Sequence, residues 1–144
     1  MERITILFLS FLPISEIRGS ILYGILKTEL PVWEIYFLSI LGNSLVIFSY
    51  FFFEFLLRNL EKIAFKNILK KYFQYQYLKN KKLIERLALF GLFLLVAIPL
   101  PFSGAWTGTL ISVLFKIEFK KAFFPIFGGI LIAGMIVLIT VSSI

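Results

Sequence analysis

Two ionisable residues, Glu16 and Arg18, interrupt an otherwise apolar stretch that runs from residue 4 to residue 26. Inside a hydrocarbon layer a lone charge is costly unless it is paired or hydrated, so such residues mark functional sites by default. The guanidinium of Arg18 offers planar donors that suit a phosphate, and the carboxyl of Glu16 can carry a proton. The alternative is that both side chains reach the membrane surface. We predict a substrate-binding site formed by Glu16, Arg18, Ser15, Ser20, Ser103, Trp106 and Thr107.

Missing residue types narrow the chemistry further. The chain has no His and no Cys, and all of its acidic residues are Glu. Thiolate and imidazole catalysis and the usual transition-metal ligand sets are therefore absent. We predict a protein that is not an enzyme and that uses no cofactor or metal.

The composition indicates that lipid is the solvent. Hydrophobic residues make up 60% of the 144 residues and charged residues 16%, with a mean hydropathy of +0.95. Soluble domains are about 45–50% apolar and about a quarter charged. We expect an all-α integral membrane protein with several passes through the cell (plasma) membrane and with membrane lipids as partners.

The positive charge is concentrated between residues 58 and 86. This segment holds nine basic residues and two glutamates, which gives +7, the net charge of the whole chain. Basic loops stay on the cytoplasmic side, so the segment is a cytoplasmic connector. Apolar and basic residues recur in it at helical spacing, which suits an amphipathic helix on the membrane surface, although a solvated basic loop fits too. These residues are Ala64, Phe65, Ile68, Tyr72 and Tyr75 on one side and Lys62, Lys66 and Lys70 on the other. No motif in it favours nucleic acid.

The apolar stretches differ in length. Residues 31–57 and 122–144 are long enough for transmembrane helices. Residues 4–26 and 87–115 are broken in the middle into arms of about half a bilayer, so each forms a re-entrant hairpin or one kinked span. The positive-inside rule favours hairpins, because they return the basic linker 116–121 to the cytoplasm. The residues expected to break the helices at the hairpin tips are Pro13, Gly19, Pro99, Pro101 and Gly104.

The two halves of the chain follow the same plan. Residues 1–57 and 87–144 each read as a re-entrant hairpin followed by a transmembrane helix, and superposing Pro13 on Pro101 brings the glycines of the long helices within two residues of each other. We predict an inverted repeat whose two tips meet near the midplane, as in transporters. Because two full spans per chain are too few to enclose both tips, we also expect a homodimer.

Two sequence elements carry a family resemblance. PISEIRGSILYG at residues 13–24 and IPLPFSGAWTG at residues 98–108 resemble the small multi-drug export membrane protein family, a distant relative of the DedA/VTT superfamily. Leu22, where family members often have Pro, and Phe102-Ser103, where they often have Gly-Thr, depart from the pattern.

The resemblance implies a transport protein. DedA relatives suggest a flippase- or scramblase-type carrier of phosphorylated lipid, either polyprenyl phosphate or phospholipid, with proton coupling through Glu16. The alternative is a proton-coupled small multidrug exporter of organic cations, which should contain an aromatic, acidic cavity.

Overall fold

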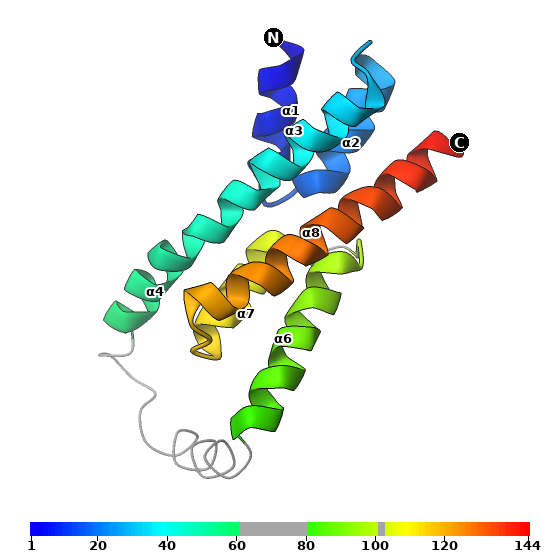
Figure 1. Ribbon diagram of the computed structural model, residues 1–144. Helices are drawn as coiled ribbons and strands as arrows, with labels where there is room; N and C mark the ends of the chain where they lie inside the picture. Colours follow the sequence, from blue (N-terminus) through cyan, green and yellow to red (C-terminus); the bar gives the residue numbers. More distant parts are fainter. Residues whose placement is uncertain (61–80, 101–102) are drawn as a thin grey trace.

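The computed structural model describes residues 1–60, 81–100 and 103–144, and within these ranges the secondary structure is helical throughout (Figure 1). The helices are α1 (Glu2–Phe11), α2 (Glu16–Lys27), α3 (Val32–Ser44), the 3-10 segment η1 (Leu45–Phe48), α4 (Ser49–Leu60), α6 (Lys81–Ala97), α7 (Ala105–Leu114) and α8 (Phe119–Ser142). The predicted amphipathic connector helix lies outside the described residues.

Among the described residues, two helices are long and apolar enough to cross a membrane. One is the continuous run Val32–Asn59 of 28 residues and the other is α8 with 24 residues. At about 1.5 Å per residue, both exceed the roughly 30 Å of a hydrocarbon core. The first has a joint at Leu45–Phe48, where the helix changes from α-helical to 3-10 geometry between α3 and α4. The second is a single α-helix.

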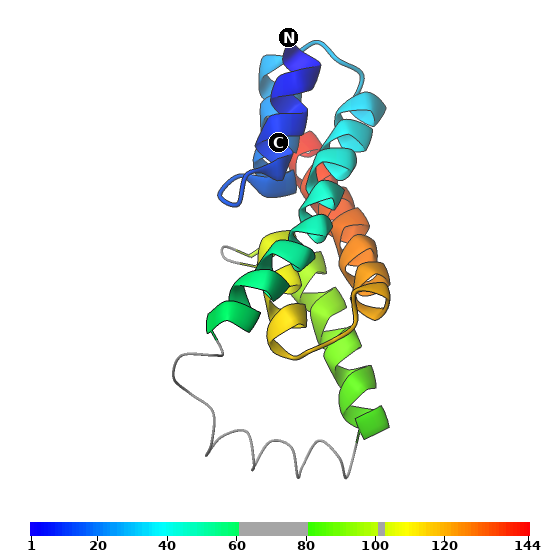
Figure 2. The ribbon, with the colours of Figure 1, turned by 90° about the vertical axis from the view of Figure 1, so that its left-hand side faces the viewer.

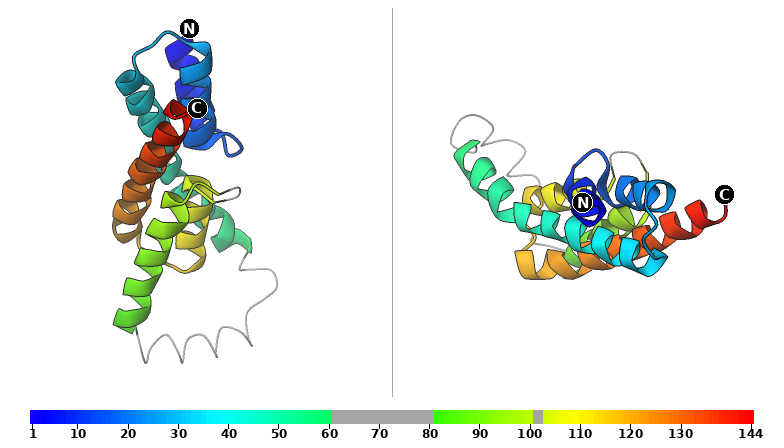
Figure 3. Two further views of the ribbon diagram at one scale, coloured as in Figure 1. Left: turned by 90° about the vertical axis from the view of Figure 1, so that its right-hand side faces the viewer. Right: turned by 90° about the horizontal axis from the view of Figure 1, so that it is seen from above.

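The four other helices that the structure describes form two antiparallel pairs. The first pair is α1 with α2, separated by residues 12–15, and the second is α6 with α7, separated by residues 98–104. The turn of the first pair points down and that of the second points up in Figures 1 and 2, so both face the middle of the molecule. Figure 3 shows the two pairs end to end. The chain termini lie at one end, and the ends of α4 and α6 at the other.

Prolines and a glycine explain most of the breaks. Pro13 lies in the first break and Pro99 in the second, where the missing amide hydrogen and fixed φ interrupt helical pairing. Gly104 precedes α7. The prediction for Gly19 is wrong, because this residue lies inside α2. A Cβ at Gly19 would meet Cβ of Ser15 at 2.5 Å, so its role is close packing at the start of the helix.

The ends of two helices extend into the basic segment. α4 continues to Leu60, and α6 begins at Lys81, six residues before the predicted hairpin. Lys and Arg are good helix formers, so a positive charge does not mark the end of a helix. At this end of the molecule Lys121 Nζ lies 3.9 Å from Glu85 Oε2, which joins α8 to α6.

The first arm of each pair packs on the following long helix in the same manner. Gly42 of the first long helix lies against the Leu7 carbonyl and the side chain of Ser10 in α1. Gly129 of α8 lies against the Phe93 carbonyl and the side chain of Val96 in α6. In both cases the partners are three residues apart, and the missing side chain allows the helices to approach closely.

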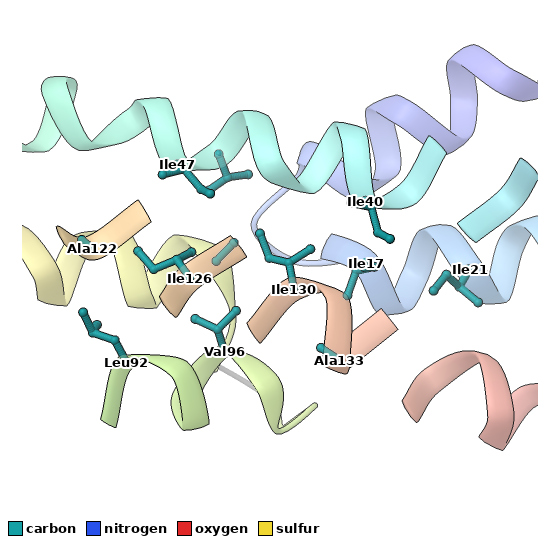
Figure 4. Packing of buried hydrophobic residues seen from close by; sticks show 12 residues of the cluster. Ile17, Ile21, Ile40, Ile47, Leu92, Val96, Ala122, Ile126, Ile130 and Ala133 are labelled. Atoms are coloured by element: carbon teal, nitrogen blue, oxygen red, sulfur yellow. The ribbon is translucent and has the colours of Figure 1, made fainter. Parts of the chain in front are cut away.

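Apolar packing between the halves forms the core. Ile17 and Ile40 from the first half lie in one cluster with Ile126 and Ile130 of α8 and Val96 of α6 (Figure 4). The hydroxyl of Tyr36 donates to the Leu131 carbonyl at 3.0 Å, and that of Tyr50 donates to the Ile117 carbonyl at 2.7 Å. The two halves are therefore held together by apolar packing and by hydrogen bonds from the first long helix to α8 and to the linker before it.

Candidate functional site

Direct hydrogen bonds join the two breaks, although they are more than 80 residues apart in the sequence. Arg18 Nη2 donates to the carbonyl of Ser103 at 2.6 Å. In the opposite direction, the indole nitrogen of Trp106 donates to the carbonyl of Phe11 at 2.8 Å. The Phe11 carbonyl is at the end of α1, where the helix itself provides no partner. The start of α2 and the start of α7 therefore form one local structure.

Glu16 occupies the centre of this structure. It is the first residue of α2 and has a φ of 47°, a left-handed conformation that is uncommon and strained for residues other than glycine. The residue is only 6% exposed. Its carboxylate accepts a hydrogen bond from the backbone amide of Trp106, in the first turn of α7. The acidic side chain thus caps a helix from the other half of the chain, and the positive end of that helix stabilises its charge.

Gly104 leaves the space that the carboxylate fills. A Cβ built on Gly104 would collide with the Glu16 carboxylate, and the φ of this glycine is +145°. A side chain at this position would therefore meet a steric clash and an unfavourable backbone conformation. The absence of a side chain at Gly104 in the second break therefore provides the space for the Glu16 carboxylate from the first.

Aromatic rings form a wall around the indole of Trp106, the residue whose backbone amide donates to the Glu16 carboxylate. The ring of Trp106 lies 5.6 Å from that of Phe11 and 6.0 Å from that of Phe53, both in edge-to-face geometry. Phe53 belongs to α4, so three elements contribute to this wall. The sequence analysis missed Phe11 and Phe53, because the chain has 18 Phe residues and nothing in their spacing distinguishes these two.

Three predicted hydroxyl groups already donate within the protein. Ser15 donates to the Leu9 carbonyl and Ser20 to the Ile17 carbonyl at 3.0 Å. Ser103 lies in the second break and donates to the carbonyls of Ile98 and Leu100 at 2.7 and 2.8 Å. These hydroxyls stabilise the helix ends, and the structure does not direct their protons toward a ligand. Thr107 follows Trp106 in α7, and Pro101 lies outside the described residues.

A second acidic and aromatic site lies on α4, away from the breaks. It is a surface groove of about 430 Å³. Its lining consists of Phe51, Glu54, Phe55, Arg58 and Asn59. Here Arg58 stands four residues after Glu54, so a cation in the groove would face a competing positive charge. The glutamate between the breaks is the better buried of the two.

Comparison with known protein families gives one match. The family described as "Putative small multi-drug export protein" matches residues 16–136, from Glu16 to Ile136. The matched region contains both sides of the contact between Glu16 and α7. No curated protein and no solved structure matches the chain.

Proposed function

Because the chain belongs to the small multi-drug export family, we propose that it exports organic cations in exchange for protons, and that Glu16 is the exchanging group. The observation that carries the proposal is the buried Glu16 carboxylate, which accepts a hydrogen bond from the backbone amide of Trp106, the residue whose ring packs against Phe11 and Phe53. A carboxylate provides charge for a cation, and aromatic faces attract cations with apolar bodies. A relation to the DedA/VTT superfamily remains a prediction.

The phosphorylated-lipid hypothesis receives less support from the same geometry. A phosphate would bind at the amides of a helix N-terminus and at the Arg18 guanidinium. The Glu16 carboxylate already occupies the N-terminus of α7. One arm of the guanidinium donates to the Ser103 carbonyl. An anionic head group would have to displace both contacts and would meet the like charge of Glu16.

In the proposed exchange, the strained backbone of Glu16 and its hydrogen bond to the start of α7 act together. In the proposed cycle, the charged form of Glu16 rests on the N-terminus of α7, which offsets the cost of its left-handed backbone. A proton or an organic cation neutralises the carboxylate and weakens its attraction to the helix end. The hydrogen bonds of Arg18 and Trp106 then remain between the two breaks. Binding at Glu16 thereby loosens the junction between the halves.

We further propose that the helix pairs re-enter the membrane as an inverted repeat. The two turns point toward each other from opposite ends of the molecule, and the two glycine contacts are equivalent. The termini would then lie outside, and the start of α8 in the cytoplasm. Ile14 in the first turn is 97% exposed. Because irregular backbone does not face lipid, we propose that a second copy covers this side as a homodimer.

Single cysteines can test the topology and the dimer, because the chain has none of its own. Lys120→Cys at the start of α8 should react with an impermeant thiol reagent only from the cytoplasmic side. Ile14→Cys should form a disulfide-linked dimer in membranes, and Phe124→Cys on the exposed side of α8 serves as the matched control. Labelling of Lys120→Cys from outside would contradict the re-entrant arrangement. Equal cross-linking of Ile14→Cys and Phe124→Cys would contradict a dimer contact at the first turn.

Transport by the purified protein tests the function directly. In vesicles with a proton gradient, the wild-type chain should accumulate a fluorescent lipophilic cation above the level of empty vesicles. It should not increase the movement of a labelled anionic phospholipid between leaflets. Lipid movement without cation accumulation would instead support the phosphorylated-lipid carrier.

A further inference from the structure

An apolar groove lies between α6 and α7, the two arms of the second helix pair. Its volume is about 250 Å³. The lining consists of Ala88, Gly91, Leu92 and Leu95 of α6, Ile111 and Phe115 at the end of α7, and Ile117 of the following linker. The residues from α6 recur at helical spacing, so they form one wall about 10 Å long. Gly91 and Phe115 are exposed, and the groove therefore opens to the surroundings of the chain.

Gly91 keeps part of this groove empty. A Cβ at Gly91 would meet no atom within 4 Å among the described residues, whereas a Cβ at each of the other glycines would meet a neighbouring group within that distance. Glycine weakens the interior of a helix, and in membrane helices it commonly serves the close approach of a partner. Since no described part of the chain approaches Gly91, its partner comes from outside.

The lining favours a hydrocarbon chain over an organic cation. All of the lining residues are apolar, so a positive charge would lose its hydration without gaining a counter-charge. The volume also lies below the roughly 300–1,000 Å³ of sites for drug-sized ligands. An acyl chain needs no polar partner, and the hydrocarbon of one leaflet, about 15 Å deep, is long enough to cover the wall of α6.

A lysine in an unusual conformation stands at the end of the groove. Lys116 lies between Phe115 and Ile117, both of which line the groove. The amides of Lys116 and Ile117 donate to the carbonyls of Val113 and Ser112 at 3.0 and 2.9 Å, which ends α7 in a Schellman motif. The φ of Lys116 is 55°, at the position of this motif where glycine is usual. A lysine there has a conformational cost, which indicates that its side chain has a role.

The charges around this lysine leave the end of the groove positive. Lys121 Nζ lies 3.9 Å from the carboxylates of both Glu85 and Glu118. Residues 116–121 together with Glu85 hold three lysines and two glutamates, a net charge of +1. The exposed Lys82 and Arg86 at the start of α6 add to this at the same end of the molecule (Figure 1). Positive charge beside a membrane attracts anionic head groups.

A second copy of the chain suits the groove less well. In a dimer with its twofold axis along the membrane normal, the same ends of the two copies meet. Contact through this groove would then bring Lys116 and the basic start of α6 close to identical positive charges. An anionic lipid fills the same apolar space and neutralises that charge.

We infer that the groove binds one anionic phospholipid, with an acyl chain against Gly91 and the phosphate at Lys116. The lipid is resident between the two arms of the second helix pair and is not moved across the membrane. This inference does not rest on the proposed export function. It concerns only binding, so binding is what the experiment measures.

The test is native mass spectrometry of the purified chain in detergent with added dioleoyl phosphatidylglycerol or dioleoyl phosphatidylcholine. The wild type should retain one phosphatidylglycerol per chain and less phosphatidylcholine, which has the same acyl chains without a net charge. Gly91→Leu should lose the bound lipid, because its side chain enters the groove from a position where a Cβ meets nothing. Leu94→Phe adds bulk at an exposed position of α6 outside the groove and should retain the lipid.

Lys116→Gly tests the head group separately. Glycine relieves the left-handed backbone, so the unfolding temperature without lipid should be at least that of the wild type. Its retention of phosphatidylglycerol should fall to the level of phosphatidylcholine. Lys27→Gln removes the same charge at the end of α2, at the opposite end of the molecule, and should keep the preference for phosphatidylglycerol.

The same spectra report the outcomes that would overturn the inference. If Gly91→Leu retains phosphatidylglycerol as the wild type does, the groove is not the lipid site. If Gly91→Leu instead converts a dimer to a monomer with lipid retention unchanged, a second copy occupies the groove. If Lys116→Gly keeps the preference for phosphatidylglycerol, the assignment of the phosphate to Lys116 is wrong. None of these results depends on cation export, so a failure of the proposed function is seen separately in the vesicle assay.

Discussion

Glu16→Gln is expected to reduce proton-driven export of organic cations to the level of empty vesicles while the protein stays folded. Glutamine has nearly the same size, and its amide oxygen can still accept the hydrogen bond from the Trp106 amide. What disappears is the negative charge and the ability to carry a proton. The measurement is the uptake of a fluorescent cation into vesicles, together with the unfolding temperature of each variant.

Two further variants make this comparison specific. Glu54→Gln removes the other carboxyl that lies among aromatic residues and should leave export unchanged. Arg18→Gln should also retain export, because its amide can donate to the Ser103 carbonyl and a positive charge that competes with the cargo is gone. Full export by Glu16→Gln, combined with its loss in Glu54→Gln, would move the cargo site to the groove on α4.

Gly104→Ala is expected to destabilise the junction between the breaks by about 1–3 kcal/mol and to impair export. The added Cβ would collide with the Glu16 carboxylate and would also impose an L-residue at a φ of +145°. The measurement is thermal unfolding in detergent. Gly91→Ala is the matched control, because a Cβ at Gly91 meets nothing within 4 Å and should be neutral.

A double variant separates the two causes. Adding Glu16→Ala to Gly104→Ala removes the atoms with which the new Cβ collides. The combined loss of stability should therefore be smaller than the sum of the single losses. Strict additivity would mean that the glycine and the carboxylate do not touch and that only the backbone conformation matters.

The helical elements could be predicted from the sequence because their causes are local. Hydrophobic length reveals the two long helices, and Pro13 and Pro99 interrupt helical pairing wherever they stand. The family resemblance is confirmed as well. The sequence wrongly predicts Gly19 as a helix-breaking residue, because a glycine in a helix break and a glycine at a close contact cannot be distinguished from the sequence. Only the position of the Ser15 side chain shows which of the two applies.

The centre of the candidate site could be predicted only as a set of residue types. Glu16 and Arg18 stood out because charges are rare in apolar stretches. Their partners depend on how the halves pack. The cap on α7 joins residues about 90 positions apart, and Phe53 reaches Trp106 from a third element.

The 3-10 segment makes the two halves mechanically unequal. α8 is one continuous α-helix that holds Pro125 near its start, whereas the first long helix has a 3-10 joint in its middle, at Leu45–Phe48. Each helix is expected to bend where its regular hydrogen bonding is interrupted. α4, which carries Phe53, lies on the far side of that joint from α3. The two long helices are thus interrupted at different places, the first in its middle and α8 near its start, so the two halves of the chain are not expected to bend alike.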